Sequence, residues 1–191
     1  MFDQFNKDTF LTINKIANQA DWLNTVIVAI AEYLPFVFIV CLIYLWLSNK
    51  NNYRQSALLA GYAAVFGVTI NLLITLFYFH PRPYMEKIGV TLINHVPETS
   101  FPSDHTTFML SIAFTLSLLK NTRNIGLILM LMGVAGGLSR VASGIHYPLD
   151  ILGSMVVSMG VGFMVFIFKG TFNPINQFIE SMYSKLFNQN A

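Results

Sequence analysis

Five apolar stretches, divided by short polar breaks, most constrain what this chain can fold into. They cover residues of about 22–47, 56–79, 105–120, 124–140 and 149–168. A helix that crosses a bilayer needs about 20 mostly apolar residues, so each stretch is predicted to span the membrane, with the third and fourth the shortest. The sequence therefore predicts an all-α integral membrane protein, built as a helical bundle of about five transmembrane helices.

The composition narrows the classes of function. Only 10% of the residues are charged, whereas soluble domains average about 25%, which argues against a soluble protein. The formal net charge of +2 is too small and too dispersed for the basic stripe that binding of nucleic acid requires. Cys41 is the only cysteine, so the chain can form neither an intramolecular disulfide nor a thiolate metal cage.

Residues 1–21 interleave phenylalanine, leucine and isoleucine with aspartate and lysine, which predicts an amphipathic helix lying at the membrane surface. A secretory signal peptide is the alternative, because the Ala-Ile-Ala of residues 29–31 imitates a cleavage site. Acidic residues interrupt that leader, however, and the apolar run resumes directly after Glu32. We therefore expect an N-terminal interfacial segment over 1–21, a transmembrane domain over 22–168 and a cytoplasmic tail over 169–191.

Two residue types predict local features of the bundle. Proline marks the breaks, and Pro148 is placed where the fifth stretch begins, a position that suits the first turn of a helix. Glycine is concentrated in the fourth stretch, at Gly133, Gly136 and Gly137, where small residues let neighbouring helices approach closely.

The placement of lysine and arginine predicts the orientation, because cytoplasmic loops are enriched in them. The breaks at 48–55 and near 120 carry basic but no acidic residues, and the tail carries Lys169 and Lys185 against Glu180. These ends are predicted to lie inside the cell. The opposite ends then face outward, and their acidic residues are Asp3, Asp8, Asp21, Glu86, Glu98, Asp104 and Asp150.

Ionisable residues gather at the outer ends of spans two to five. They are His80, Arg82, Asp104, His105, Arg140, His146 and Asp150. Ionisable groups at membrane depth are costly and are functional candidates by default. Each one taken singly also fits a structural role, as an interface anchor or a helix-start residue, but their common position at one membrane face favours a site. We expect His80 and His95 to be non-catalytic.

The residue types in this cluster match phosphoryl transfer. The spacing of His146 and Asp150 puts both side chains on one helix face, so the carboxylate can fix the imidazole tautomer and leave a nucleophilic nitrogen. His105 is then a candidate for protonating a leaving oxygen. Arg82 and Arg140 carry forked guanidinium groups that match phosphate oxygens. The helix start that follows Ser103 would add backbone N–H groups for an anion.

Three ordered segments resemble the signature motifs of the type 2 phosphatidic acid phosphatase (PAP2) superfamily. The general motifs are K-x6-R-P, P-S-G-H and S-R-x5-H-x3-D, and this chain has Arg82-Pro83, FPSDH at 101–105 and SRVASGIHYPLD at 139–150. The resemblance covers about residues 55–168. The stretches FHPRP at 79–83 and SFPSDHTT at 100–107 are similar to the bacitracin-resistance type of undecaprenyl pyrophosphate phosphatase.

The resemblance implies a role for each matching residue. The catalytic residues are His146 as a nucleophile that becomes a phosphohistidine, Asp150 as its partner and His105 as the general acid. The phosphate-binding residues are Arg82, Ser103 and Arg140. No metal and no cofactor is implied.

Two positions depart from the motifs. Thr75 stands where the first motif has its lysine, and Lys87 is the candidate replacement for the missing charge. Asp104 replaces the glycine of the second motif. Its carboxylate is expected either to turn away and cap the third span or to tune His105.

The implied activity is hydrolysis of undecaprenyl pyrophosphate to undecaprenyl phosphate and inorganic phosphate, which recycles the cell-wall lipid carrier and confers bacitracin resistance. The expected partners are this polyprenyl diphosphate and membrane lipids, with no nucleic acid and no obligatory protein partner. The expected location is the bacterial plasma membrane, with the site on the extracytoplasmic side. One alternative is a phosphatase for phosphatidylglycerol phosphate, phosphatidic acid or lipid A. A less favoured one is a non-catalytic transporter or immunity partner, for which polar residues deep in several spans would be expected.

Overall fold

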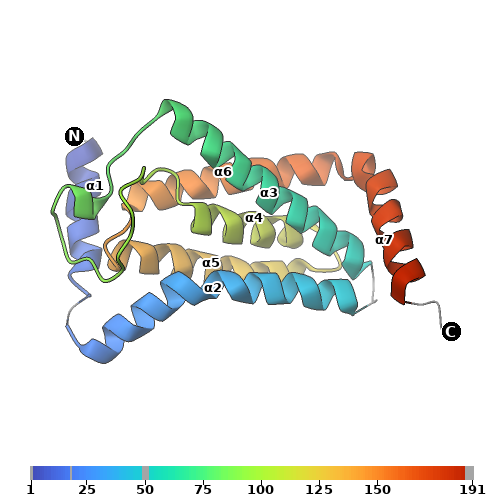
Figure 1. Cartoon of the computed structure of the whole chain (residues 1–191), viewed down its shortest axis with the longest axis horizontal. Helices are drawn as coiled ribbons and strands as arrows, with labels where there is room; N and C mark the ends of the chain where they lie inside the picture. Colours follow the sequence, from blue (N-terminus) through green and yellow to red (C-terminus); the bar gives the residue numbers. More distant parts are fainter. Residues whose placement is uncertain (1, 18, 49–51, 188–191) are drawn as a thin grey trace.

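The computed structural model describes residues 2–17, 19–48 and 52–187, and within these ranges every regular element is a helix (Figure 1). Five helices lie side by side as a bundle: α2 (Asp21–Leu47), α3 (Tyr53–Phe77), α4 (Asp104–Leu118), α5 (Arg123–Ala142) and α6 (Pro148–Ile167). At one end of the bundle α1 (Phe2–Asn14) packs across it, and at the other lies α7 (Asn173–Phe187). Two short 3-10 helices are formed by Pro83–Met85 and Lys169–Phe172. The predicted all-α bundle is confirmed.

Within the described part of the chain, four helices are long and apolar enough to cross a membrane: α2, α3, α5 and α6, with 27, 25, 20 and 20 residues. The helix α4 has 15 residues, about 22 Å at 1.5 Å per residue, which is short of the ~30 Å hydrocarbon core. It lies inside the bundle, packed against α3, α5 and α6. The expected five spans are therefore four full-length candidates and one shorter helix that the others surround.

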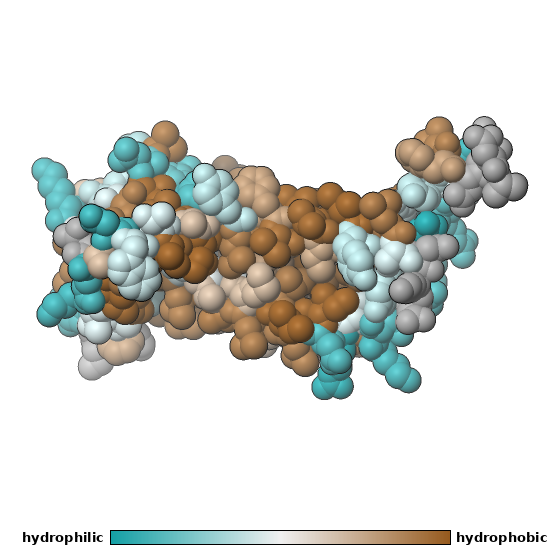
Figure 2. Space-filling view, turned by 90° about the horizontal axis from the view of Figure 1, so that it is seen from below, coloured by the Kyte–Doolittle hydropathy of each residue, from teal (hydrophilic) through white to brown (hydrophobic). Residues whose placement is uncertain are grey.

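The surface divides into three zones along the bundle. On the face drawn in Figure 2, hydrophobic residues cover the middle of the molecule and hydrophilic residues gather towards both ends. Large side chains on the outside of the spanning helices include Phe77, Leu131 and Val156, which are 89%, 75% and 70% exposed. Contiguous apolar surface of this kind is expected to meet lipid rather than water.

The predicted helix start and glycine packing are both found. Pro148 is the first residue of α6, where its missing N–H costs no helical hydrogen bond. A Cβ atom added to Gly133, Gly136 or Gly137 would lie only 2.7, 2.7 or 2.8 Å from a neighbouring side chain. These glycines therefore bring α5 close to its neighbours, as predicted.

The two ends of the chain also form helices. The predicted N-terminal helix is present as α1, and its place at the membrane surface stays a prediction. The C-terminal tail contains α7, which the sequence analysis did not predict. It is held to α3 by hydrogen bonds from Gln55 Nε2 to Asn173 Oδ1 (3.1 Å) and from the Tyr62 hydroxyl to Asn176 Oδ1 (2.8 Å).

Candidate active site

His146 lies in the short connection between α5 and α6 and is only 1% exposed. Its Nδ1 is 2.8 Å from the carbonyl oxygen of Ser100. Because a carbonyl oxygen can only accept, Nδ1 carries the proton and Nε2 keeps its lone pair. Burial lowers the pKa of His146 to about 4, against the opposing effect of its contact with Asp150. The ring is therefore a neutral imidazole at physiological pH, the form in which Nε2 is a nucleophile.

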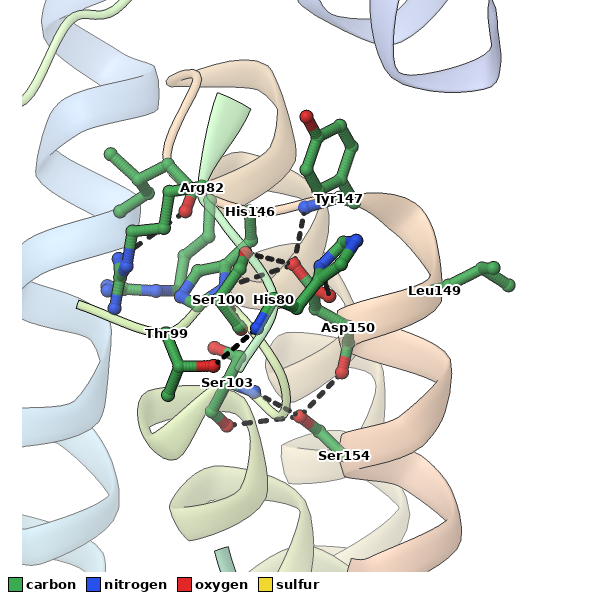
Figure 3. Close-up of polar contacts among 12 residues, drawn as sticks. His80, Arg82, Thr99, Ser100, Ser103, His146, Tyr147, Leu149, Asp150 and Ser154 are labelled. Atoms are coloured by element: carbon green, nitrogen blue, oxygen red, sulfur yellow. Dashed lines mark hydrogen bonds and ion pairs between the residues drawn. The ribbon is translucent and has the colours of Figure 1, made fainter. Parts of the chain in front are cut away.

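Asp150, in the first turn of α6, is held so that one carboxylate oxygen faces this imidazole (Figure 3). Its Oδ2 accepts hydrogen bonds from the backbone N–H of Tyr147 (2.7 Å) and from the Ser100 hydroxyl, and lies 3.4 Å from His146 Nδ1. The predicted pairing of His146 with Asp150 is thus a close contact between the carboxylate and a neutral imidazole. The shorter bond to Nδ1 comes from Ser100, which the sequence analysis did not single out.

The two arginines predicted to bind phosphate are both buried at this end of the bundle. Arg140, in the last turn of α5, is 1% exposed and donates from Nη1 to the carbonyl oxygen of Ala31 (3.0 Å). Arg82 is 5% exposed and donates from Nη2 to Glu98 Oε1 (2.7 Å). Burial lowers the pKa of Arg82 and the charge of Glu98 opposes that shift, but a guanidinium keeps its charge at neutral pH.

These arginines lie close to both candidate catalytic histidines. The charges of Arg82 and Arg140 act on the rings of both His105 and His146. The Nε atom of each arginine is buried and has no hydrogen-bond partner among the described residues. Two fixed cations with unused donors, next to a neutral nucleophile, form an arrangement that can take up a phosphate group.

Ser103 and His105 come from the start of α4. Ser103 precedes the helix and is fully buried. Its backbone N–H donates to Ser154 Oγ (2.9 Å), and its hydroxyl accepts from Thr106 Oγ1 (3.0 Å). The N–H group of Ser103 is therefore already engaged by α6, so an anion at this helix start would rely on other donors. His105 is the second residue of α4 and is exposed, which leaves its ring accessible.

This site coincides with the part of the chain that matches a known family. The profile of the PAP2 superfamily matches residues 56–174. The chain belongs to the PAP2 superfamily.

Two relatives and one solved structure are similar to most of this chain, including residues outside 56–174. The chain is 36% identical to the undecaprenyl-diphosphatase BcrC of Bacillus subtilis (strain 168), over 96% of this chain and 94% of the relative. It is 29% identical to the bacitracin transport permease protein BcrC of Bacillus licheniformis, over 97% of this chain and 90% of the relative. The crystal structure of Aquifex aeolicus LpxE superposes with a TM-score of 0.70 at 25% identity, covering 85% of this chain and 94% of that one.

Among the described residues, three further positions singled out against the PAP2 motifs form no hydrogen bond or ion pair with His146 or Asp150. The Asp104 carboxylate accepts from Asn71 Nδ2 of α3 (2.9 Å). The N-cap position of α4 is occupied by Ser103, so Asp104 does not take the expected capping position. The Thr75 hydroxyl donates to the carbonyl oxygen of Leu72 within α3 (2.8 Å). Lys87 is exposed, and no ion pair among the described residues joins it to the site.

The long loop between α3 and α4 and the N-terminal helix add contacts that the sequence did not predict. Tyr147 donates its hydroxyl to the Glu86 carboxylate, and Lys7 Nζ lies 2.9 Å from Glu86 Oε1. The bond from Tyr147 and then that from Lys7 lower the pKa of Glu86. This chain of contacts ties α1 and the loop to the residue that follows His146.

Within residues 2–17, 19–48 and 52–187, no group of three or more His, Cys, Asp or Glu side chains is arranged to hold a metal ion. Metal-independent chemistry stays a prediction.

Proposed function

We propose that this protein is a membrane lipid phosphatase that hydrolyses undecaprenyl pyrophosphate to undecaprenyl phosphate and inorganic phosphate. The observation that carries the proposal is the neutral, buried His146, with its Nδ1 proton fixed by Ser100 and its Nε2 free beside two buried arginines. The choice of substrate is supported by the 36% identity, over nearly the whole chain, to a relative named as an undecaprenyl-diphosphatase.

The proposed reaction has two steps. Nε2 of His146 attacks the terminal phosphorus and forms a P–N bond, while the bridging P–O bond breaks and His105 gives its proton to the leaving prenyl phosphate. Water then forms a P–O bond as the P–N bond breaks, and His105 takes up the water proton. Arg82 and Arg140 offset the negative charge that spreads over the phosphoryl oxygens.

We further propose that the site faces the extracytoplasmic side. The charges support this orientation: Arg54, Lys120, Arg123 and Lys169 lie at the end of the bundle remote from α1 and the site, and basic ends are retained in the cytoplasm. A cysteine at the exposed position Thr91, in a Cys41→Ala background, is expected to react with an impermeant maleimide on intact cells. Reaction only after the cells are broken open would refute this orientation.

The activity is tested by phosphate release from purified protein in detergent with EDTA present. Undecaprenyl pyrophosphate, phosphatidylglycerol phosphate and phosphatidic acid are compared, each with wild type and His146→Ala. Metal-independent turnover of the diphosphate that the substitution abolishes is the expected result. Preference for another lipid would retain the chemistry and refute the cell-wall role.

The transporter alternative has one observation in its favour, the name of the bacitracin transport permease relative. Folded protein that releases no phosphate from any of the three lipids would support that alternative and refute the phosphatase.

A further inference from the structure

The two oxygens of the Asp150 carboxylate have different surroundings. Oδ2 receives hydrogen bonds from Ser100 and Tyr147 and faces His146. Oδ1 points to the other side, where His80 Nδ1 lies 3.5 Å away (Figure 3). One buried carboxylate therefore lies between two imidazoles, one of which has no part in the chemistry proposed above.

The His80 ring is held firmly in this position. Its backbone N–H donates to Thr99 Oγ1 (3.1 Å), and its carbonyl oxygen accepts from the N–H of Ser100 (2.7 Å). The ring stacks on Tyr78, with 6.2 Å between ring centroids and a 10° interplanar angle, and its centroid is 5.1 Å from that of Tyr147. The segment that bonds both His146 and Asp150 therefore also positions His80.

The facing atoms of His80 and Asp150 are not hydrogen-bonded to each other. His80 Nδ1 and Asp150 Oδ1 are both buried, and neither has a hydrogen-bond partner among the described residues. A buried polar atom without a partner is destabilising, because it has lost water and gained no hydrogen bond in return. Since the two atoms are a donor and an acceptor, closing their separation by ~0.5 Å would give each the partner it lacks.

A cavity of about 460 Å³ adjoins this pair. Its lining includes His80, Asp150, Tyr78, Phe101 and Leu149. The His80 side chain is 20% exposed, whereas that of Asp150 is 1% exposed. The nearby Asp150 carboxylate is the main cause that raises the pKa of His80, and Glu86 and Asp3 add to the shift.

We propose that His80 is a positioning residue that holds Oδ1 of Asp150, so that Oδ2 stays directed at Nδ1 of His146. The proposal rests on the proposed function, in which His146 becomes cationic as it attacks phosphorus and needs a fixed carboxylate beside it. With Oδ1 released, the carboxylate can rotate away from that ring. Among the described residues no hydrogen bond joins His80 to Arg82 or Arg140, so its loss should act on the chemical step rather than on binding.

The test compares kcat and KM for His80→Ala and His80→Asn with the lipid that the wild-type enzyme turns over. Residues that orient a metal-binding histidine typically contribute about 10–100-fold to activity. By analogy, His80→Ala is expected to lose kcat by about 10–100-fold, with KM changed less than about twofold. An asparagine amide nitrogen stands near the position of Nδ1, so His80→Asn should recover most of the loss. His95→Asn, a histidine of the same loop whose Nδ1 is 3.3 Å from Glu98, is the matched control and should retain kcat.

Three results would overturn the proposal: an unchanged kcat in His80→Ala, a rise in KM as the main effect, or an equal loss of kcat in both His80 variants. The asparagine variant keeps the test decisive if the alanine variant folds poorly. Failure of the proposed function is recognised separately, because wild type would then release no phosphate, or His146→Ala would retain activity whatever the His80 variants do.

Discussion

Ser100 offers the sharpest test of how the site is built, because one residue contacts both members of the proposed pair. Its hydroxyl donates to Asp150 Oδ2, and its carbonyl oxygen accepts from His146 Nδ1. The change Ser100→Ala removes only the hydroxyl, so the carbonyl bond that fixes the His146 tautomer is kept. The variant therefore isolates the anchoring of the carboxylate.

The size of the effect follows from the chemistry of that bond. A hydrogen bond to a charged group in a buried site contributes about 1.5–3 kcal/mol, and Ser100 is fully buried. If the bond acts chiefly in the transition state, kcat falls by about 10–150-fold, since each ~1.4 kcal/mol is a factor of ten. The assay is phosphate release in detergent under saturating lipid, with the melting temperature of each variant measured alongside.

Ser111→Ala is the matched control. Ser111 is also fully buried, but its hydroxyl has no hydrogen-bond partner among the described residues. Removing an unpaired buried hydroxyl should leave kcat unchanged and keep or raise the melting temperature. A Ser100→Ala enzyme within about twofold of wild type, with its fold intact, would refute the idea that Ser100 anchors Asp150.

Three further outcomes are expected. A Cβ at Gly126 would overlap the α4 backbone, whereas one at Gly61 meets nothing within 4 Å. Gly126→Ala should therefore cost about 1–3 kcal/mol of stability and Gly61→Ala should gain up to about 1, as melting temperatures in detergent will show. The pKa of His146, about 4 when folded, lies below its usual value of about 6.5, so only the unfolded chain takes up this proton between those pH values. The free energy of unfolding should therefore fall by on the order of 3 kcal/mol as the pH is lowered from about 6.5 to about 4. His146→Gln should show a flatter pH dependence of stability. Asn14 makes three hydrogen bonds to backbone groups, one of them buried and two part-buried. Asn14→Ala should therefore lower stability by about 3 kcal/mol at ~1 per bond. An unchanged melting temperature would show that α1 does not stabilise the loop.

Much of the fold was predictable because lipid imposes a simple rule on the sequence. A spanning helix must be apolar along its length, so the expected stretches at 22–47 and 149–168 match α2 and α6 within one residue at each end. Proline and arginine also marked the ends of the spans in the sequence: Pro148 begins α6 and Arg140 lies in the last turn of α5. The charged candidates were expected at one end of the bundle because successive spans run in opposite directions.

The missed site residues are those whose role depends on contacts remote in sequence. Ser154 bonds the backbone of Ser103 from 51 residues away, and His80 meets Asp150 only because the loop returns to α6. A neutral serine in an apolar helix carries no pattern that separates it from other small residues. The missed helix α7 did leave a signal, since apolar residues recur at 175, 178, 179, 182 and 186 with helical spacing.

The N-terminal helix α1 buries polar side chains and exposes apolar ones. Asn6, Phe10 and Asn14 are four residues apart, share one face of α1 and are 3%, 0% and 2% exposed. The exposed side of the helix carries Phe5 and Leu11 at 66% and 44%. In water this distribution would be inverted, with asparagine outside and leucine inside.

Two requirements account for that distribution. The loop and the start of α6 leave backbone groups that need hydrogen-bond partners, and the two asparagines supply them. Asn14 bonds the N–H and the carbonyl oxygen of Val90 and the carbonyl oxygen of Ala142. Asn6 accepts from the N–H of Leu149. The apolar side chains are then left for the membrane surface on which the helix is predicted to lie. Because Ala142 and Leu149 bracket the connection that carries His146, the same helix that would contact lipid also fixes the backbone around the proposed nucleophile.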